Sequence, residues 1–590
     1  MIKEQFQQSY QQTNQKCIQL QKQSNQFAFM RFGIIVLMIV CLLVGYFQTK
    51  PFLYIFSILG IFVFVFMVYH HNHIKKELLY QQALCLTYQN HLKRINNQWH
   101  ELIDTGDEFI DEKSYKAIDL DIFGKHSLFQ MINVSFTQKG KETLAALLND
   151  DHSIDNVLMH QQAVQELALH EDFVLKLETL GKMIPHQKEK IIKRWQEESC
   201  HLNISSITPL IFIVSLLTCL GLIGVCFSIA MPYSQVILEI GAVFQLGFAF
   251  LYIKKHQELF EPIVYLGKGL ESYAHIYAHI HNQTFQCAYL QELQTQICIE
   301  GRACEGIEKL LKISQRVNYR QNIFAFVILN ALGMFDFVVR NQYAKWLNDY
   351  GSSIQTWFDG LAKLEALMSL SVLKIDDFQV SVPHICHEKT LSFQNVRHPL
   401  IASDKVVGND FVMDESLCMI TGSNMSGKTT FMRTVGLNLI LAYAGGYVFA
   451  DEMTCSCMHI MTSMRVKDNV EEGISTFYGE LLRIKDMIEY AKKKEPMICF
   501  IDEIFKGTNS LDRIAGAQAT IKKLSLPYAY TFLTTHDLEL SHMKAQNYHF
   551  DEYYQDEQIC FDYRIKKGPS QTTNGQFLLR QLGILDDFIS

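Results

Sequence analysis

From position 422 the sequence reads Gly422-Ser423-Asn424-Met425-Ser426-Gly427-Lys428-Thr429-Thr430, between a strand-like run at 417–421 and a helix-like run at 431–442. A glycine loop that ends a strand and opens a helix is the arrangement of a P-loop, whose backbone N–H groups surround a phosphate. Lys428 is expected to reach the β- and γ-phosphate oxygens of ATP, and the Thr429 hydroxyl to bind Mg²⁺. The C-terminal region therefore predicts an α/β P-loop NTPase domain in which all nine residues contact ATP.

Two further polar sites follow strand-like runs downstream of this loop. Residues 497–501 (Met-Ile-Cys-Phe-Ile) predict a buried parallel strand with Asp502 and Glu503 at its carboxyl end. Asp502 is expected to lie near the bound metal, and Glu503 to activate the attacking water as a general base. The alternative is a solvated acidic turn. His536 ends another strand-like run at 530–535 and is expected to contact the γ-phosphate, the alternative being a plain surface residue.

The composition limits the classes of partner and of metal site. The chain has 590 residues and is 48% hydrophobic, which favours membrane segments, and its net charge of −8 gives no support to DNA binding. Its fifteen cysteines form no CxxC frame, which indicates reduced thiols in the cytosol. Cys455, Cys457 and His459 alternate as on one face of a strand. We interpret them as a core-facing patch rather than a metal site.

Four charge-poor apolar runs predict four transmembrane helices in two hairpins. The first hairpin comprises residues 32–47 and 51–69, and the second comprises residues 207–230 and 236–253. The alternative is that these runs are buried core helices. Glu239 lies in the fourth run and is expected to face the other helices, because a carboxylate is costly in lipid. Whether it forms a proton or ion site stays open.

Basic residues flank the hairpins on one side only. The opposite connections carry only Lys50, whereas the other flanks carry Lys22, Arg31, Lys75, Lys76, Lys254 and Lys255. The positive-inside rule therefore places the N-terminus, residues 74–206 and everything after 254 in the cytoplasm. We expect a multi-pass cell-membrane protein that contacts membrane lipid and whose ATPase domain meets cytosolic ATP.

The remaining chain reads as helical up to about residue 375, where short apolar runs begin to alternate with helices. Residues 324–339 are expected to form a buried core helix rather than a fifth membrane segment, because Asn330, Gly333 and Asp336 interrupt them. The predicted order is a polar arm, helical or disordered, at 1–30, hairpins at 31–70 and 207–254, helical segments at 71–206 and 255–375, and the ATPase domain at 376–590.

Several motifs resemble those of the MutS family of DNA mismatch-repair ATPases. TGSNMSGKTT at 421–430 is similar to the family's TGPNMGGKST loop, IDEIFKGTNSLDR at 501–513 to its DEIGRGTST segment, and TTHDLEL at 534–540 to its THY-x-EL motif. All matches occur in the family's order. The shorter matches are Arg397-His398-Pro399, Asp468-Asn469, Gly473–Phe477, Ser127–Phe129 with Thr137–Leu144, and Leu364–Ser369, the last two sets resembling the start and end of the family's helical core.

The resemblance implies an ABC-like, Mg²⁺-dependent ATPase domain after an all-α core, and a homodimer through the ATPase domains. Ser475 and Thr476 would complete the ATP site of the other subunit, with Asn509 near the interface. ATP would close a clamp on mismatched or branched DNA in DNA repair, and hydrolysis would release it. No Phe-x-Glu wedge precedes the core, so mismatch recognition by that route is not expected. The chain ends at Ser590, after the nucleotide domain, so no nuclease domain is expected.

Two other classes of function stay open. An ATPase that remodels a membrane or protein partner without DNA would also explain the membrane helices and the acidic net charge. A transporter-type ATPase is the third class. It is disfavoured because no LSGGQ-like segment precedes Asp502 and because four crossings fall short of a six-helix pathway.

Overall fold

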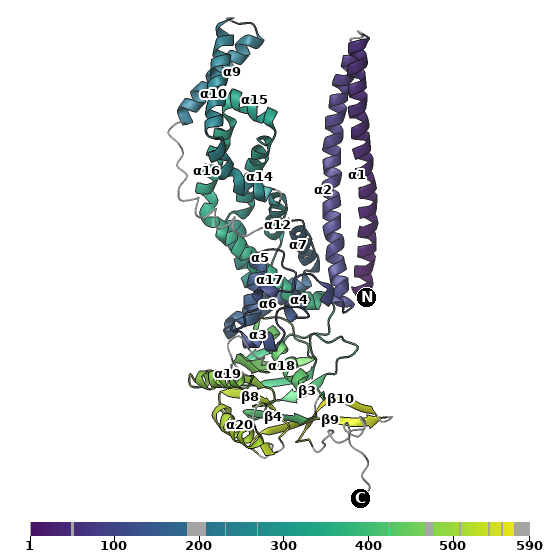
Figure 1. The fold of residues 1–590 in the computed structure, drawn as a ribbon, viewed down its shortest axis with the longest axis vertical. Coiled ribbons are helices and arrows are strands. Elements are labelled where there is room, and N and C mark those ends of the chain that lie inside the picture. Colours follow the sequence, from purple (N-terminus) through teal and green to yellow (C-terminus); the bar gives the residue numbers. More distant parts are fainter. Residues whose placement is uncertain are drawn as a thin grey trace.

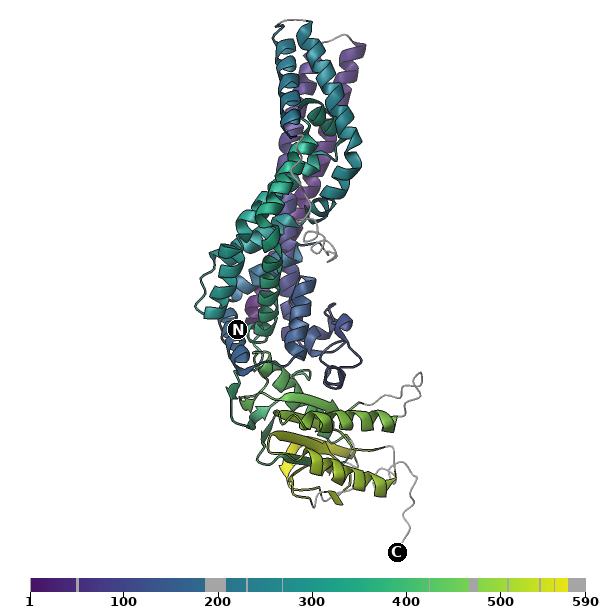
Figure 2. The same ribbon diagram turned by 90° about the vertical axis from the view of Figure 1, so that its left-hand side faces the viewer.

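The computed structural model is a long molecule in which two helical arms extend from a helical core and an α/β domain lies at the opposite end (Figures 1 and 2). The structure describes residues 2–48, 52–185, 208–229, 232–267, 269–423, 425–465, 476–506, 509–537, 539–540, 543–555 and 558–570. The two arms stand apart in Figure 1, where the colours show that both precede the α/β domain in sequence.

The first arm is an antiparallel hairpin of α1 (Ile2–Phe47) and α2 (Phe52–Ile95). The polar N-terminal residues are helical and continue directly into the apolar run, so the helical alternative is the one observed. Phe6 is 1% exposed and packs its ring against Tyr88 and His91 at the base of α2. Lys16 pairs with Glu77 at 2.9 Å. The polar half of the hairpin is therefore attached to the helical core, whereas its apolar half extends away from it (Figure 1).

The helical core unites segments that lie more than two hundred residues apart. Its helices include α3 (Tyr115–Asp119), α4 (Leu128–Ile132), α5 (Gln138–Asn149), α6 (Ile154–Leu169), α7 (Glu171–Lys182) and α17 (Ile354–Ile375). The buried Glu365 of α17 accepts hydrogen bonds from the backbone N–H groups of Phe136 and Thr137, at 3.0 and 2.9 Å. Burial raises the pKa of Glu365 to about 8. The two motifs that resemble the ends of the MutS helical core are thus in direct contact.

The second arm contains two apolar helices and a bent pair. Its helices are α9 (Thr208–Cys226), α10 (Tyr233–Leu251), α11 (Ile253–Gly267), α12 (Leu270–Asn282), α13 (Ala288–Gln294), the π-helix η3 (Thr295–Glu300), α14 (Ala303–Tyr319), α15 (Ile323–Gly333) and α16 (Phe335–Tyr350). Among the described helices, α1, α2 and α10 are long and apolar enough to cross a membrane, and the bent pair that begins with α15 passes the same test when taken as one span. Over its residues 212–226, α9 is a shorter apolar helix. Four crossings therefore stay a prediction.

Two expectations about the apolar segments were wrong. Residues 324–339 do not form one buried core helix, because the chain bends by 84° between α15 and the helix that follows and leaves Phe324 76% exposed. Glu239 does not face the other helices of its arm: it is exposed and accepts a hydrogen bond from Gln235 of its own helix at 2.9 Å. The inward polar position is instead Gln245, which is buried and donates to Thr218 at 2.7 Å.

The first arm meets the core through a buried histidine. The two ring nitrogens of His91 lie 2.5 Å from Asp376, where the chain leaves α17, and 3.0 Å from Glu178 of α7. Burial by itself would lower the pKa of His91, but the two carboxylates raise it to about 9. A protonated His91 therefore joins the base of α2 to the entry of the α/β domain.

We expect His91→Ala to lower the free energy of unfolding by about 3–5 kcal/mol, because Asp376 would lose its buried cationic partner. The pKa of His91 is higher in the folded protein than its unfolded value near 6.5, so the stabilisation is complete below about pH 6.5 and is lost as the pH rises through 9. Thermal unfolding in detergent between pH 6 and pH 10 measures this. The variant should lose the pH dependence, and equal melting temperatures for the two proteins would contradict the assignment.

The α/β domain contains two sheets. A six-stranded sheet has the order β10-β9-β4-β8-β7-β6, in which β9, β4, β8, β7 and β6 pair in parallel and β10 is antiparallel to β9. Its strands are β4 (Leu417–Gly422), β6 (His459–Ser463), β7 (Met497–Ile501), β8 (Ala529–Thr534), β9 (Gln546–Gln555) and β10 (Gln558–Lys567). The smaller sheet, β1-β5-β2-β3, contains β1 (His384–Cys386), β2 (Leu391–Val396), β3 (Asn409–Val412) and β5 (Glu452–Ser456).

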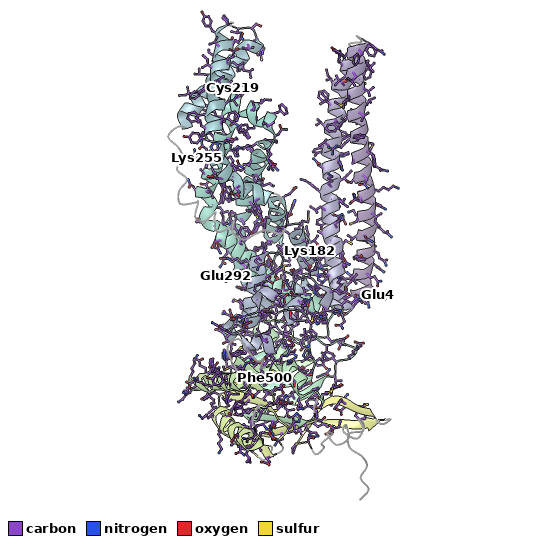
Figure 3. The ribbon with its side chains drawn as sticks, in the orientation of Figure 1. Glu4, Lys182, Cys219, Lys255, Glu292 and Phe500 are labelled. Atoms are coloured by element: carbon purple, nitrogen blue, oxygen red, sulfur yellow. The ribbon has the colours of Figure 1, made fainter. Side chains whose placement is uncertain are left out.

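Both faces of the large sheet are covered. The apolar side chains of β4 alternate: Cys418 and Ile420 join the core shared with α18 (Lys428–Tyr443) and the helical core, whereas Leu417 and Met419 join a second core. That second core includes residues of α19 (Thr476–Ala491) and α20 (Ser510–Leu524). Full burial of a parallel strand requires this continuous apolar composition. The expected strand at 497–501 is β7, which is buried throughout and carries Phe500 (Figure 3).

Candidate functional site

The glycine loop joins β4 to α18 with two glycines in conformations that other residues rarely adopt. Gly422 has a φ of 140° and Gly427 a φ of 112°. Both angles lie in the region that glycine alone adopts without strain. Gly422 also lies close to β9, the neighbour of β4 in the sheet, since a Cβ at position 422 would lie 2.8 Å from the carbonyl oxygen of Phe550. The glycines at both ends thus set the shape of the loop, of which Asn424 lies outside the described residues.

Lys428 lies inside the mouth of this loop. Its ammonium group donates to the carbonyl oxygens of Gly422 and Ser423 at 2.9 and 2.7 Å, and the residue is 4% exposed. Burial lowers the pKa of Lys428 to about 8, although the charge of Asp502 opposes this effect. An ammonium held by neutral carbonyl groups is short of negative charge, so an incoming phosphate would favour its charged form.

Asp502 connects the loop to the neighbouring strands. One carboxylate oxygen accepts from the Thr429 hydroxyl at 2.8 Å, and the other accepts from the Thr534 hydroxyl at 2.5 Å. The three residues come from α18, the end of β7 and the end of β8, whose carboxyl ends meet at one edge of the sheet. A hydroxyl and a carboxylate side by side provide the oxygen ligands that Mg²⁺ prefers.

Glu503 follows in a strained turn with a φ of 51°. Its side chain is 13% exposed and contacts His536 at 3.0 Å and Lys506, while its backbone N–H donates to Thr534 at 2.9 Å. Burial lowers the pKa of His536, and the nearby Lys428 and Lys506 charges lower it further, so this imidazole is neutral at pH 7. A carboxylate held beside a neutral imidazole at the edge of the sheet is suited to orienting a water and accepting its proton.

The geometry fits a Mg²⁺-nucleotide. The Ser426 hydroxyl is 1% exposed and has no hydrogen-bond partner among the described residues, so it has donor capacity left for a phosphate oxygen. Lys428 and the loop amides would hold the phosphates, and Thr429 with Asp502 would hold Mg²⁺, which supplies charge neutralisation at the phosphates. Thr430 is exposed at the start of α18, and Met425 is exposed in the loop.

Three expected dimer residues are only partly covered by the structure. Ser475 lies outside the described residues, and Thr476 is described only as the first residue of α19. Asn509 caps α20, because its side-chain oxygen accepts from the backbone N–H of Asp512 at 2.9 Å. A capping role is common for asparagine at this position. Their part in a dimer interface stays a prediction.

The structure adds residues that sequence reasoning did not select. Thr534 lies inside the TTHDLEL motif, yet its bond to Asp502 requires the pairing of β7 with β8. Glu552 is buried on β9 and accepts from the Ser423 hydroxyl at 2.6 Å. Only the parallel pairing of β9 with β4 reveals that contact, because no motif marks residue 552.

The patch of Cys455, Cys457 and His459 does not lie on one strand face, contrary to our expectation. Cys455 is buried on β5 of the small sheet, whereas His459 begins β6 of the large sheet. The His459 ring stacks on Tyr490 at 4.2 Å between centroids and bonds to Asp151 of the helical core. The chain changes sheets between the two, so the alternation of a single strand does not apply.

Two carboxylates of the helical core contact the ATPase domain beside the site. Asp119, fully buried at the end of α3, accepts from the backbone N–H groups of Met464 and Arg465 at 2.9 and 3.0 Å. Asp121 pairs with Arg465 at 2.5 Å and with Arg433 of α18 at 3.2 Å. The helix that opens at Lys428 is thus ion-paired to the helical core.

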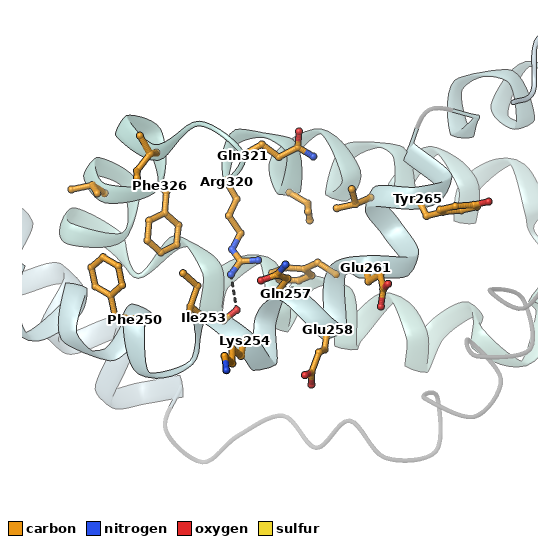
Figure 4. A pocket seen from close by; sticks show the side chains of 15 residues that line it. Phe250, Ile253, Lys254, Gln257, Glu258, Glu261, Tyr265, Arg320, Gln321 and Phe326 are labelled. Atoms are coloured by element: carbon orange, nitrogen blue, oxygen red, sulfur yellow. Dashed lines mark hydrogen bonds between the residues drawn. The ribbon is translucent and has the colours of Figure 1, made fainter. Parts of the chain in front are cut away.

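A cavity of about 960 Å³ lies elsewhere in the molecule, between α11 and the α14–α15 region (Figure 4). It is lined by apolar side chains such as Phe326 and by charged ones such as Lys254. Arg320 crosses it and donates to the carbonyl oxygen of Ile253 at 2.9 Å. The cavity belongs to the second arm and contains none of the expected site residues.

Comparison with known proteins agrees with this geometry. Residues 418–584 match the family model described as MutS domain V. The C-terminal domain is a MutS domain V. MutS domain V is an ATPase domain. Over 253 residues, 41% of this chain and 29% of the relative, the sequence is 30% identical to the "DNA mismatch repair protein MutS" of Listeria welshimeri. It is 32% identical to the protein of the same name from Leuconostoc citreum over 252 residues, 40% of this chain and 29% of that protein.

The match to MutS proteins is confined to part of each chain. Our chain spans less than a third of the length of these relatives. The resemblance of the helical core to the MutS core therefore stays a prediction from the sequence motifs.

Proposed function

We propose that the protein is a membrane-anchored, MutS-like ATPase dimer in which Mg²⁺-dependent ATP binding and hydrolysis switch the helical arms as a clamp, with mismatched or branched DNA in DNA repair as the leading substrate. The observation that carries the proposal is the meeting of Lys428, Asp502, Glu503 and His536 at one sheet edge of a MutS domain V. The DNA part comes from the names of the MutS relatives. The membrane part rests on three helices that are long and apolar enough to span.

In this mechanism each residue at the sheet edge has a separate role. Lys428 and the loop amides would hold the phosphates, and Asp502 with Thr429 would hold Mg²⁺. Glu503 accepts a proton from the attacking water, and the neutral His536 holds the Glu503 carboxylate in place at 3.0 Å. The partner subunit would supply the Ser475 region to the same site.

DNA binding by the full-length protein in detergent tests the clamp. We expect binding of mismatched or branched duplex to tighten with ATP and to weaken as salt rises, because contacts to phosphates release counterions. Perfect duplex of equal length is the control. Indifference to all DNA, with ATP turnover intact, would exclude the clamp on DNA and leave the ATPase.

The alternative function is an ATPase that remodels a membrane or protein partner. It is favoured by the ends of both arms, where the large apolar side chains of Phe47 and Phe227 are 78% and 74% exposed. In water such surfaces are rare, so these arm ends are suited to lipid or to another apolar partner. Arms that end in lipid would transmit the ATP switch to the membrane instead of to DNA.

The ion pairs of Asp121 would couple the ATP-driven switch to the arms, and this role can be tested by substitution. Asp121→Asn removes the charge that holds Arg433 of α18 and Arg465. We expect ATP to remain bound, stability to change by no more than about 1 kcal/mol, and ATP-dependent hydrogen-exchange protection in α5 and α17 to be lost. Asp155→Asn, at an exposed position on α6 of the same core, is the matched control. Unchanged protection in Asp121→Asn would show that coupling runs elsewhere.

A further inference from the structure

A group of three potential metal ligands lies at the junction between the second arm and the helical core. His281, Cys298 and Cys304 each offer one ligand atom, and these three atoms lie within 4.8 Å of one another. They are the one such His/Cys/Asp/Glu group in the part of the chain that the structure describes. Neither the sequence motifs nor the proposed ATPase cycle uses these residues.

The three residues come from three elements of one stretch of the chain, with α13 between the first two. His281 is in the last turn of α12, Cys298 is in the π-helix η3, and Cys304 is in the first turn of α14. The helix α13, whose Glu292 is labelled in Figure 3, connects α12 to η3. Sequence reasoning missed the group because the spacings of 17 and 6 residues match no common zinc motif.

Both thiols point at the same place on α12. The Cys298 and Cys304 sulfurs each donate to the carbonyl oxygen of Tyr277, at 3.8 and 3.3 Å. Residues four apart in a helix share a face, so Tyr277 and His281 lie one above the other on α12. The thiols therefore meet α12 on the face that carries the imidazole.

The backbone around the thiols is fixed by packing. In η3 the N–H of Gly301 bonds to Gln296 five residues earlier at 2.9 Å, a π-type bond, and the Gly301 carbonyl accepts from the buried Trp357 indole at 2.6 Å. A Cβ at Gly301 would lie 2.7 Å from the Gln296 oxygen, so this turn requires glycine. Arg302 follows with a φ of 51°. Short π-helical turns and residues with a left-handed backbone conformation are frequent at functional sites, where they change the direction of side chains.

We propose that His281, Cys298 and Cys304 bind a thiophilic divalent cation, with Zn²⁺ the best fit. Two thiolates and one imidazole are the ligands that zinc selects, and three protein ligands leave a fourth tetrahedral position for water. His281 is exposed, so water can reach that position. Binding releases the two thiol protons to solvent, and the two resulting thiolates balance the charge of the cation.

The bound ion would join α12, η3 and α14 into one rigid unit. The Trp357 that fixes η3 belongs to α17, which leads directly into the ATPase domain at residue 376. Metal occupancy would therefore stiffen the junction between the second arm and the helix that enters that domain. This inference depends on the arm and not on the ATPase cycle.

The competing chemistry for two neighbouring cysteines is a disulfide. The cytosolic location that we expect for this segment is reducing, which disfavours a structural disulfide. A disulfide would also not explain why a ring nitrogen of His281 lies within 4.8 Å of both sulfur atoms. The experiment must therefore distinguish a metal site from a cysteine pair.

The test uses full-length protein in detergent, reduced and stripped of metal, titrated with Co²⁺ and then with Zn²⁺. We expect one equivalent of Co²⁺ to give a thiolate-to-cobalt charge-transfer band and tetrahedral visible bands that Zn²⁺ abolishes. Cys298→Ser with Cys304→Ser should remove the bands, and His281→Ala should weaken binding at least about tenfold. Cys287→Ser and the exposed His275→Ala of α12 are matched controls and should keep them.

A measurement without substitutions guards against variants that fail to fold. Zn²⁺ should slow alkylation of Cys298 and Cys304 in the native protein and leave Cys287 unaffected, as read by mass spectrometry. Absence of the thiolate band, or the same band in the double cysteine variant, would overturn the proposal. A Cys298–Cys304 disulfide in protein isolated from a reducing cytoplasm would do the same.

Discussion

Glu503→Gln is expected to lower ATP turnover by roughly 10²- to 10⁴-fold while leaving ATP binding close to that of the native protein. Glutamine keeps the size of the side chain and can still contact His536 and Lys506, but it cannot accept a proton from water. Glu503 lies outside the loop that binds the phosphates, so the affinity for ATP should be retained. The substitution removes only the group that acts in the transition state.

Two measurements separate this effect from general damage to the domain. Equilibrium ATP binding and steady-state phosphate release are compared in Glu503→Gln and in Glu489→Gln, an exposed carboxylate of α19 that pairs with Lys492. The control should hydrolyse ATP normally. Native turnover in Glu503→Gln would show that another group activates the water, and loss of binding in it would show that residue 503 is structural.

A stalled Glu503→Gln enzyme would also reveal the dimer. If each ATP site is completed by the other subunit, the variant should accumulate as the closed dimer, because its bound ATP is not hydrolysed. Mass measurements with and without ATP would show a shift toward twice the monomer mass. A monomer at every ATP concentration would contradict the dimeric clamp.

The meeting of the sheet-edge residues was predictable because it follows from one rule of parallel sheets. Residues at the carboxyl ends of neighbouring strands converge, so a loop at 422–430 and polar residues at 502, 503 and 536 had to come close once β4, β8 and β7 were adjacent. The local sequence was sufficient for this, since each group directly follows its own apolar strand.

The contacts that join distant segments were not predictable from local sequence. Asp121 and Arg433 are 312 positions apart, and His91 and Asp376 are 285 positions apart. No periodicity marks such partners, because each is an ordinary charged residue in its own segment. The prediction that Glu239 faces the other helices failed for a different reason. Hydropathy gives the cost of a carboxylate in lipid, but it does not give the face of the helix on which the carboxylate lies.

Lys428→Ala is expected to weaken ATP binding by about 100-fold or more. The ammonium would make charge-assisted hydrogen bonds to phosphate oxygens, each contributing about 1.5–3 kcal/mol, and about 1.4 kcal/mol corresponds to a tenfold change in affinity. In the native protein these donors point at the carbonyl oxygens of Gly422 and Ser423, in the loop where we expect the phosphates to bind. The alanine would also leave both carbonyl groups without that partner.

The matched control for Lys428→Ala is Lys389→Ala. Lys389 also donates to a backbone carbonyl of the same sheet, that of Ala529 at 3.0 Å, but at the amino end of β8, away from the glycine loop. Loss of ATP binding in both variants would indicate damage to the sheet rather than loss of a phosphate contact. Native affinity in Lys428→Ala would remove the P-loop from the proposed mechanism.

The same lysine makes the affinity for ATP depend on pH, with a sign that follows from burial. Burial lowers the pKa of Lys428 to about 8, and a triphosphate stabilises the charged form, so ATP affinity should fall as the pH rises above 8. Lys428→Arg, which stays charged, should lose this dependence even if its larger side chain fits the loop less well. Calorimetric titration in two buffers of different ionisation enthalpy would also show proton uptake on ATP binding above pH 8. If the affinity is flat between pH 7 and pH 9.5, the ammonium is already fully charged before ATP arrives, and the loop does not desolvate it as the geometry requires.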